Sequence, residues 1–364
     1  MKLNLLAIAI PALLVAAGAN ASIEVWNKDG NKVDFYGRVK AANNITDRGQ
    51  KDEGDDTSAR LGMSGQTQIT DSLVGYGRWE YEAKAGKNSD NEVRYAFAGL
   101  NFGDLGSFDY GRNDGVLKAI TAYTDVLPQF GGEAANNDWN VLSSRTKAVA
   151  TYRNNNFFGL TDDVSFALQY ADNGDNSNTK YFKDRIKDES REAYGANAQW
   201  RIFDTGLTAG AGYAQTTQSD NRHNTWAAGL KYENYDLYLG ANYFQSKLKF
   251  DSNYDVKLRG FELVAQYGID LEVGRLTPSL AYVQHKVKDY GHDRDGINSP
   301  VAKYVSLGAT YDLNKNFSAI VEYKFNLLDR KDEGAKLNTV KDRGHHENKP
   351  GTKDVLGVGL IYQF

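Results

Sequence analysis

Side chains that could carry catalytic or metal chemistry are scarce in this sequence and poorly spaced for it. The chain has five histidines and no cysteine. None of the histidines lies in a metalloprotease motif, and there is no Gly-x-Ser-x-Gly nucleophile elbow. The sequence DRDG at Asp293 resembles the start of a calcium loop, but Tyr304 stands at the twelfth position, where a bidentate glutamate is needed. We therefore predict that the protein is not an enzyme and holds no metal or cofactor.

One long, turn-rich segment has the composition of a functional loop. It spans roughly Asn113–Ser144 and contains the sequence YTDVLPQFGGEAANNDW. Loops of this length in a compact domain are usually functional. Pro128 fixes φ at the start of a bend, and Gly131 and Gly132 allow the positive φ that a tight bend needs. What this loop acts on depends on the elements that hold it.

The first residues have the features of an export signal. Lys2 supplies a positive charge, Leu3–Ala17 is largely apolar, and Ala19-Asn20-Ala21 is a small-x-small cleavage site. A membrane anchor is the alternative, but the apolar run is short for a spanning helix of about 20 residues. We predict a signal peptide over residues 1–21 and a single mature domain over residues 22–364.

The overall composition narrows the class of protein. The formal net charge is −4, which argues against nucleic acid as a partner. Mean hydropathy is −0.59, and no later segment is apolar enough for a membrane-spanning helix. A transmembrane β-barrel remains compatible with these values, because its apolar residues alternate with polar ones and the mean hydropathy stays low.

Period-two alternation runs through most of the chain. In the sequence FSAIVEYKFN, residues 317–326, Val321, Tyr323 and Phe325 share one face, whereas Glu322 and Lys324 lie on the other. Such alternation indicates strands with one apolar and one polar face. The charges on the polar faces are too numerous for a dry core and suit a water-filled lumen. The fold class predicted is therefore all-β.

Sixteen strands of this kind can be counted, joined alternately by short turns and long polar loops. This alternation of connections is typical of an antiparallel transmembrane β-barrel of the bacterial outer membrane, and sixteen strands leave an aqueous channel. The predicted strands begin near Lys32, Ser58, Ser72, Glu92, Gly106, Arg145, Val164, Glu192, Gly206, His223, Asp236, Tyr254, Arg275, Ala302, Asn316 and Thr352.

Several long stretches resemble the general diffusion porins of Gram-negative bacteria, of the enterobacterial outer-membrane protein F and C type. They include NKDGNKVDFYG, ARLGMSGQTQI, FAGLNFGDLGSFDYGRNDGV and VAQYGIDLEVGRLTPSLAY. The resemblance covers nearly all of residues 22–364. It implies a homotrimeric outer-membrane channel for passive diffusion of ions and small hydrophilic solutes.

The resemblance also implies a constriction. LPQFGG is similar to the signature of the family's third extracellular loop, which folds into the barrel and narrows the pore. The family's acidic loop positions correspond to Asp125, Gln129 and Glu133, with Gln129 standing where glutamate is usual. The facing basic wall corresponds to Arg38, Arg60, Arg94 and Arg145. Opposed charges of this kind create a transverse field that admits small polar solutes and disfavours bulky apolar ones.

The sign of the ion selectivity follows from the balance of charges. The arginines alone favour anions, but Glu92 lies close to Arg94 on the same strand face. Further carboxylates are expected to line the lumen, namely Glu80, Glu82, Glu262 and Glu322. The sequence thus predicts weak cation selectivity. A phosphate- or sugar-specific channel, or a barrel that serves as the scaffold of an adhesin or receptor, is the alternative.

Three further partners are predicted. Phe364 is a terminal aromatic residue after an alternating strand, which resembles the family's recognition signal for the barrel-assembly machinery. Lipid and lipopolysaccharide of the outer membrane are the expected surroundings. The acidic residues between Asp52 and Asp56 either form a solvated face or contact divalent cations that bridge lipopolysaccharide. The adjacent histidines His345 and His346 are either solvated surface residues or metal ligands.

Overall fold

The structure is a computed structural model, and it describes residues 22–50, 52–86, 91–137, 139–172, 192–217, 223–250, 254–290, 297–332 and 351–364. The predicted signal peptide lies outside these residues, as do Asp293, His345 and His346. Within the described ranges, no helix has the length and apolar character needed to cross a membrane.

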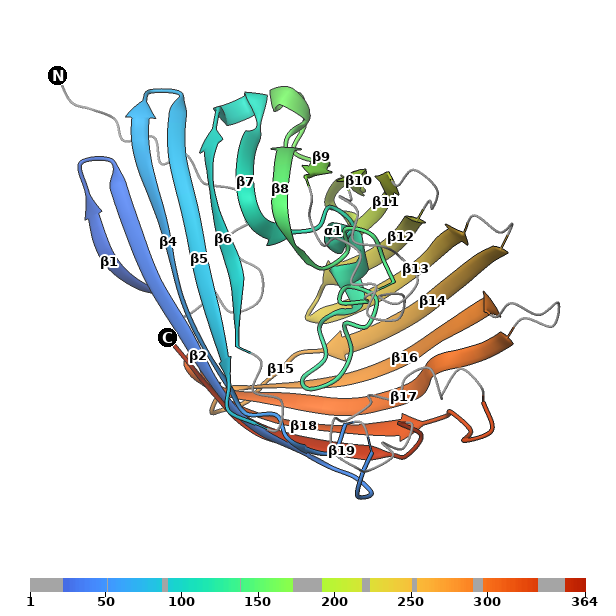
Figure 1. Ribbon diagram of the computed structural model, residues 1–364. Coiled ribbons are helices and arrows are strands. Elements are labelled where there is room, and N and C mark those ends of the chain that lie inside the picture. Colours follow the sequence, from blue (N-terminus) through green and yellow to red (C-terminus); the bar gives the residue numbers. More distant parts are fainter. Residues whose placement is uncertain are drawn as a thin grey trace.

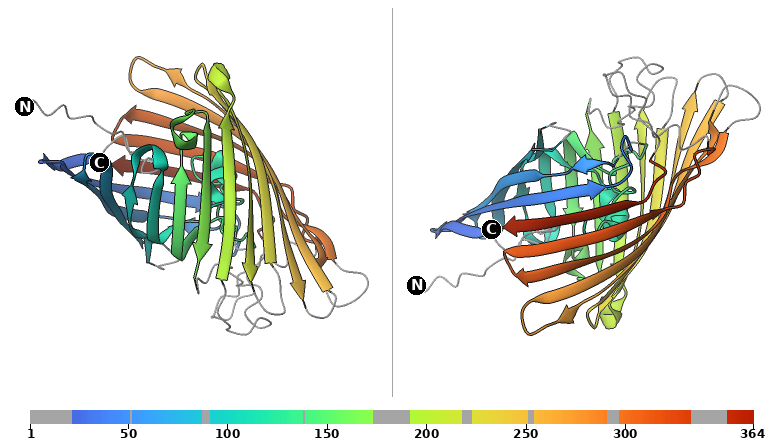
Figure 2. Two further views of the ribbon diagram at one scale, coloured as in Figure 1. Left: turned by 90° about the horizontal axis from the view of Figure 1, so that it is seen from above. Right: turned by 90° about the horizontal axis from the view of Figure 1, so that it is seen from below.

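Sixteen antiparallel strands form a closed barrel, as the alternation predicted (Figures 1 and 2). Each strand pairs with the next, and the last pairs with the first, so that Leu360 lies opposite Ala41. The wall consists of β2 (Asn31–Ile45), β4 (Ser58–Thr70), β5 (Leu73–Lys84), β6 (Glu92–Asn101), β7 (Ser107–Asp114), β8 (Arg145–Asn154), β9 (Val164–Ala171), β10 (Glu192–Arg201), β11 (Leu207–Thr217), β12 (His223–Asn234), β13 (Leu237–Phe250), β14 (Tyr254–Tyr267), β16 (Arg275–Tyr290), β17 (Ile297–Asn314), β18 (Phe317–Asn326) and β19 (Val355–Gln363).

The predicted strand starts agree with the observed ones to within one residue, except in β17 and β19. β17 starts at Ile297 rather than near Ala302, because its pairing with β16 continues past two irregularities and includes Pro300. Proline removes a ladder hydrogen bond and is unusual inside a strand, so the sequence indicated a loop there. β19 starts at Val355, three residues after the predicted Thr352.

Three short strands were not predicted. β1 (Ile23–Lys28) forms a hairpin with β2, β3 (Gly54–Asp55) pairs with the far end of β2, and β15 (Ile269–Asp270) continues the edge of β14 beside β16. All the residues of β1 are exposed. Its pairing depends on the free edge of β2 beyond the end of β19, so no local pattern could indicate it.

The faces of the strands follow the predicted alternation. On β18, Val321 and Phe325 are exposed on the outside, whereas Ile320 and Glu322 are buried on the inside. On β5, Trp79 is exposed, whereas Glu80 and Glu82 are buried. Apolar side chains thus cover the outer surface, and polar side chains point inward.

The last residue closes the seam of the barrel. The amide of Gly37 donates to the carbonyl oxygen of Phe364 at 2.7 Å, and the amide of Phe364 donates to the carbonyl oxygen of Gly37 at 2.9 Å. The Phe364 ring lies directly over Gly37, where an added Cβ would come 2.5 Å from its Cζ. β1 occupies the same edge of β2 beyond this point, with Ile23 opposite Phe35.

The segment between β7 and β8 does not extend away from the barrel. It carries α1 (Lys118–Thr121) and a 3-10 turn (Ala122–Thr124), and it is drawn within the ring of strands in Figure 1. Its first two predicted residues, Asn113 and Asp114, belong to β7, so the loop covers residues 115–144. We refer to it as the 115–144 loop.

Candidate pore constriction

The 115–144 loop packs against the inner faces of β10–β14. Ile120, Tyr123 and Trp139 form a buried apolar cluster with Phe244 and Leu258 on the wall. Wall glycines make room for it. An added Cβ at Gly229, for example, would come 2.7 Å from the Tyr123 ring. Part of the abundance of glycine in the sequence thus serves close packing between the loop and the wall.

Two buried glutamates fix the loop to the wall. Glu262 on β14 is 0% exposed and accepts hydrogen bonds from the Ala134 amide at 2.9 Å, from the Thr124 hydroxyl and from His285 Nε2 at 2.9 Å. Asn242 Nδ2 also donates to it at 3.3 Å. A buried carboxylate is tolerated only when such donors surround it.

Glu322 on β18 holds the tip of the loop. It is 0% exposed and accepts from the amides of Gln129 at 2.7 Å and Phe130 at 3.0 Å, and from the Ser306 hydroxyl. The expectation that Glu262 and Glu322 line the water-filled lumen is therefore wrong. Both accept hydrogen bonds from the loop, which is more than a hundred residues away in sequence, as well as from neighbouring strands of the wall.

The bend of the loop has the predicted backbone conformation. Gly131 has φ 92° and Gly132 has φ 70°, a region that favours glycine. Pro128 precedes them, two residues after Val126, whose carbonyl oxygen accepts from Gln266 Nε2 at 2.7 Å. The Asp125 carboxylate lies against Gly132, leaving no space for a Cβ there, and Asp125 is itself exposed.

Gln129 acts as a donor. Its Nε2 donates to Asn44 Oδ1 at 2.8 Å and to Asp56 Oδ2 at 3.1 Å. A glutamate has no hydrogen to donate and would place a second carboxylate beside Asp56. The local negative charge is therefore supplied by Asp56, which also accepts from Lys40 at 3.0 Å.

Glu133 contacts the wall that the loop packs against. The Tyr304 hydroxyl on β17 donates to its Oε1 at 2.5 Å. Burial raises the pKa of Glu133, and the nearby carboxylate of Glu262 raises it further. Glu133 therefore carries less negative charge at mildly acidic pH than a solvated glutamate does.

The four predicted arginines come from neighbouring strands on the opposite side. Arg38 on β2 lies directly opposite Arg60 on β4, and Arg94 and Arg145 follow on β6 and β8. Two more arginines, Arg78 on β5 and Arg112 on β7, belong to the same charged network and were not predicted as site residues. Their inward positions in the alternation were the available signal.

Glu80 and Glu82 are inserted between these arginines and are 4% exposed. Glu82 accepts from Arg60 at 2.5 Å and from Arg94 at 3.1 Å. Glu80 accepts from Arg94 at 2.6 Å and from Arg78 at 2.7 Å. These pairs offset the repulsion between like charges on adjacent strands.

Glu92 at the start of β6 joins three guanidinium groups. It accepts from Arg112 at 3.1 Å and from Arg145 at 3.1 Å, and it lies 3.9 Å from Arg94. Arg38, in contrast, has no carboxylate within ion-pair distance among the described side chains. The charge of the wall is thus compensated mainly at Arg60, Arg94 and Arg145.

Comparison with known proteins agrees with this architecture. Residues 28–364 match the family model described as Gram-negative porin. The chain belongs to the Gram-negative porin family. It is 42% identical to the outer membrane porin protein OmpD of Citrobacter koseri and 39% identical to the outer membrane porin N of Escherichia coli, in each case over 100% of both chains. Among solved structures, it is similar to Salmonella typhi OmpF in complex with daunomycin, with 34% identity, a TM-score of 0.76, and coverage of 94% of this chain and 100% of that one.

Membership of the family confirms two predictions from the sequence. The porin is located in the outer membrane, and it forms a channel for general diffusion. An anion-selective porin from Comamonas acidovorans shares the fold, with 17% identity and a TM-score of 0.67. At that identity the similarity shows the fold alone, so the sign of the selectivity has to be argued from the residues of this porin.

Arg78 has a structural role in the porin wall. Its guanidinium lies 4.2 Å from the ring centroid of Tyr95 and 5.4 Å from that of Tyr36, and its Nε donates to the Tyr36 hydroxyl at 2.7 Å. Its side chain is only 8% exposed. Arg78 thus supports Glu80 and is less accessible to passing solutes than the other arginines.

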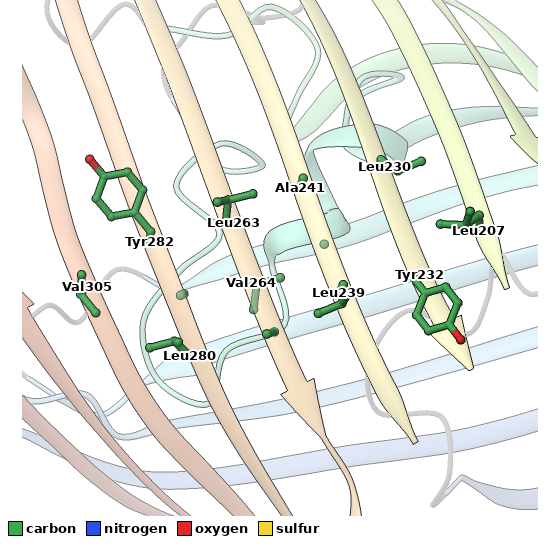
Figure 3. Close-up of a pocket in the computed structure, with 13 residues that line it drawn as sticks. Leu207, Leu230, Tyr232, Leu239, Ala241, Leu263, Val264, Leu280, Tyr282 and Val305 are labelled. Carbon is green, nitrogen blue, oxygen red and sulfur yellow. The ribbon is translucent and has the colours of Figure 1, made fainter. Parts of the chain in front are cut away.

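An apolar groove lies on the outside of the barrel, away from the channel. It has a volume of about 500 Å³ and lies over β11–β17, where Leu239, Leu263, Leu280 and Tyr282 stand on the outer face of the strands (Figure 3). Such a surface suits lipid rather than hydrophilic solutes. Within the described part of the chain, no group of three or more histidine, aspartate or glutamate side chains is placed to hold a metal ion.

Proposed function

We propose that the 115–144 loop and the facing arginines form the constriction of a general diffusion pore with weak cation selectivity. The supporting observation is the fixed position of the loop, whose tip is held by Glu262 and Glu322 on β14 and β18. The arginine wall stands on β2, β4 and β6–β8. A water-filled gap between these two sides would set the limit on solute size.

The cation preference rests on the pairing of charges. Glu80, Glu82 and Glu92 neutralise much of the arginine wall, so fewer guanidinium groups remain to attract anions. On the loop side, Asp125 is exposed, and the amide group of Gln129 donates to the carboxylate of Asp56. Charges exposed to water at physiological salt are screened over about 8 Å, which keeps the preference weak.

A reversal-potential measurement across a salt gradient in a planar bilayer tests this proposal. We expect a potential that indicates a small excess of cation permeability, and single-channel conductance in the range of an open aqueous pore. A clear anion preference would overturn the selectivity, and a much smaller conductance with saturation by one solute would indicate a specific channel instead.

The structure gives no support to a phosphate-specific pore. Such a pore needs additional basic residues on the loop, whereas Lys118 is the only lysine or arginine of residues 115–144. Its Nζ is paired with the Asp114 carboxylate at 3.0 Å. A free cation at the constriction is therefore not supplied by the loop.

We also propose that the porin assembles as a homotrimer through the outer faces of β2–β6. Val39, Leu61, Trp79 and Val93 are exposed there. An apolar outer surface of this kind can be covered by a second copy of the chain as well as by lipid. Native mass spectrometry should give the mass of three chains, and a monomeric mass at all detergent concentrations would exclude this assembly.

A further inference from the structure

A cavity of about 330 Å³ lies between the 115–144 loop and the strands that the loop packs against. Its lining comes from the bend of the loop, from β14 and β16–β18, and from the connection between β2 and β4. Asn326 and Leu328, at the end of β18 that leads into a long connection, also line it. The four predicted arginines of the opposite wall do not line it, so the cavity is separate from the gap that they face.

An ion pair lies in the lining of this cavity. Lys324 Nζ on β18 donates to Asp52 Oδ2 at 2.8 Å, and both residues line the cavity. The Lys324 side chain is 12% exposed and the Asp52 side chain is 27% exposed. The two residues are 272 positions apart in sequence, so the pair exists only because the connection between β2 and β4 reaches the inner face of β18.

The ammonium group of Lys324 has hydrogens to spare. A lysine ammonium can donate three hydrogen bonds, and among the residues that the structure describes only Asp52 accepts one from Lys324. Its Nζ lies 5.3 Å from the ring centroid of Phe130 and 4.8 Å from that of Tyr304. Aromatic rings stabilise a cation at such distances but do not replace an oxygen acceptor. Two donors therefore remain for water or a solute.

The cavity also has an acceptor without a donor. The Tyr304 hydroxyl donates to Glu133 Oε1 at 2.5 Å. Glu133 Oε2 is buried, and no donor reaches it from the described part of the chain. A buried oxygen without a donor is destabilising, so the lining favours a molecule that can donate as well as accept.

Apolar side chains form the rest of the surface that this argument uses. Trp139, Leu258, Val301 and Leu328 line the cavity. Trp139 and Leu258 belong to the buried cluster that joins the loop to the wall, so they hold a fixed position. The cavity thus combines a compact pair of opposite charges with an apolar surface.

A solute with a single charge suits this lining poorly. An anion that approaches Lys324 is repelled by Asp52, and a cation that approaches Asp52 is repelled by Lys324. A zwitterion can pair with both groups at once. In an α-amino acid, standard bond lengths place the ammonium nitrogen roughly 3 Å from a carboxylate oxygen. That separation is comparable with the 2.8 Å between Lys324 and Asp52.

We propose that the cavity binds a zwitterionic α-amino acid with an apolar side chain. Its carboxylate accepts from Lys324, its ammonium group donates to Asp52, and its side chain lies against Trp139 and Leu258. Small-molecule sites usually measure about 300–1,000 Å³, so this cavity has the size for one amino acid rather than an oligopeptide. Because the arginine wall takes no part, binding is independent of the sign of the ion selectivity.

Isothermal titration of the detergent-solubilised porin with L-leucine tests the proposal. The test variant combines Lys324→Gln with Asp52→Asn, which removes both charges and leaves the net charge unchanged. The matched control combines Lys247→Gln with Asp255→Asn, which removes a lysine–aspartate pair of 2.7 Å that does not line the cavity. We expect the test variant to bind leucine about tenfold more weakly or worse, and the control to bind it as the unmodified porin does.

Analogues with one charge provide a readout that does not depend on the folding of a variant. N-acetyl-L-leucine lacks the ammonium group and L-leucinamide lacks the carboxylate, so each should bind the unmodified porin about tenfold more weakly than leucine. Glycine, which has no apolar side chain, should also bind more weakly.

Four results would overturn the proposal. They are the absence of leucine binding to the unmodified porin, full binding by the test variant, equal loss in the test and control variants, and equal binding of leucine and either analogue. Equal binding of glycine and leucine would show that the apolar surface takes no part. The reversal potential of the unmodified channel is a separate measurement, so failure here leaves the proposed selectivity untouched.

Discussion

Two arcs of the same barrel use inward-facing carboxylates in opposite ways. In the first arc, β2 and β4–β8, Glu80, Glu82 and Glu92 accept from arginines and tune the charge of the wall. In the second arc, β10–β14 and β16–β18, Glu262 and Glu322 accept from backbone amides and hydroxyl groups and hold a loop in place. We propose that the partner of an inward-facing carboxylate, rather than the carboxylate itself, decides whether it acts on the charge of the wall or on the position of the loop.

The largest effect should come from removing what the second arc holds. Deletion of Pro128–Ala135 removes the bend and its contacts to both glutamates, so the pore should widen and admit larger oligosaccharides. Liposome swelling with sugars of increasing size measures the exclusion limit. An unchanged limit would mean that the loop does not narrow the pore.

The anchors themselves provide a second test. Glu322→Ala leaves the partly buried amides of Gln129 and Phe130 without an acceptor, at a cost of about 1–3 kcal/mol for each donor that water does not reach. We expect lower thermal stability in gel-based heat-modifiability assays and greater fluctuation of single-channel current. Glu322→Gln keeps one acceptor oxygen and should lose less. Glu272, which is exposed in the bend between β15 and β16, serves as the control, and Glu272→Gln should be neutral. Equal stability of the alanine and glutamine variants would contradict an anchoring role.

The seam that joins β19 to β2 gives the third test. Deletion of Phe364 removes the ring that covers Gly37 and the terminal pair of backbone hydrogen bonds. The amount of folded, heat-modifiable protein in the outer membrane should fall several-fold. Phe364→Tyr keeps an aromatic ring there and serves as the control. Normal assembly after the deletion would show that assembly does not depend on Phe364.

A smaller effect is expected from the charges of the first arc. Glu92→Gln frees Arg112 and Arg145 from their shared carboxylate, which should shift the channel toward anions. A change of roughly 1 kcal/mol in local electrostatic free energy corresponds to about a fivefold change in relative permeability. The reversal potential measures it, with Glu272→Gln as the control. A shift toward cations, or none, would show that Glu92 does not set the balance.

The smallest effects concern single charges on the loop. Asp125→Asn removes an exposed carboxylate and should reduce the cation preference, and Gln129→Glu should increase it. The second change also loses the donated bonds to Asn44 and Asp56, so its effect should be partly offset by a displaced side chain. Reversal potentials at two salt concentrations distinguish these outcomes. A response of the same sign from both substitutions would refute the assignment.

The alternation of apolar and polar residues determined the number of strands, their faces and the position of the long loop. That information is local, because successive side chains point to opposite sides of a strand. The resemblance to the porin family, rather than the alternation, pointed to Arg38, Arg60 and Arg94. The bend at Gly131 and Gly132 was predicted from the conformational freedom of glycine. The alternation correctly placed Glu80, Glu82, Glu262 and Glu322 on inward faces, but it could not indicate which other groups cover them.

What covers each inward side chain was decided only by the tertiary structure. Glu322 meets the amide of Gln129, a residue 193 positions away, and Glu262 meets Ala134, 128 positions away. Closure of the barrel brings these groups together, and no period in the sequence encodes it. The edge pairing of β1 and the seat of Phe364 on Gly37 have the same origin. The sequence therefore determined which residues face the lumen, whereas the tertiary structure decided which of them remain open to it.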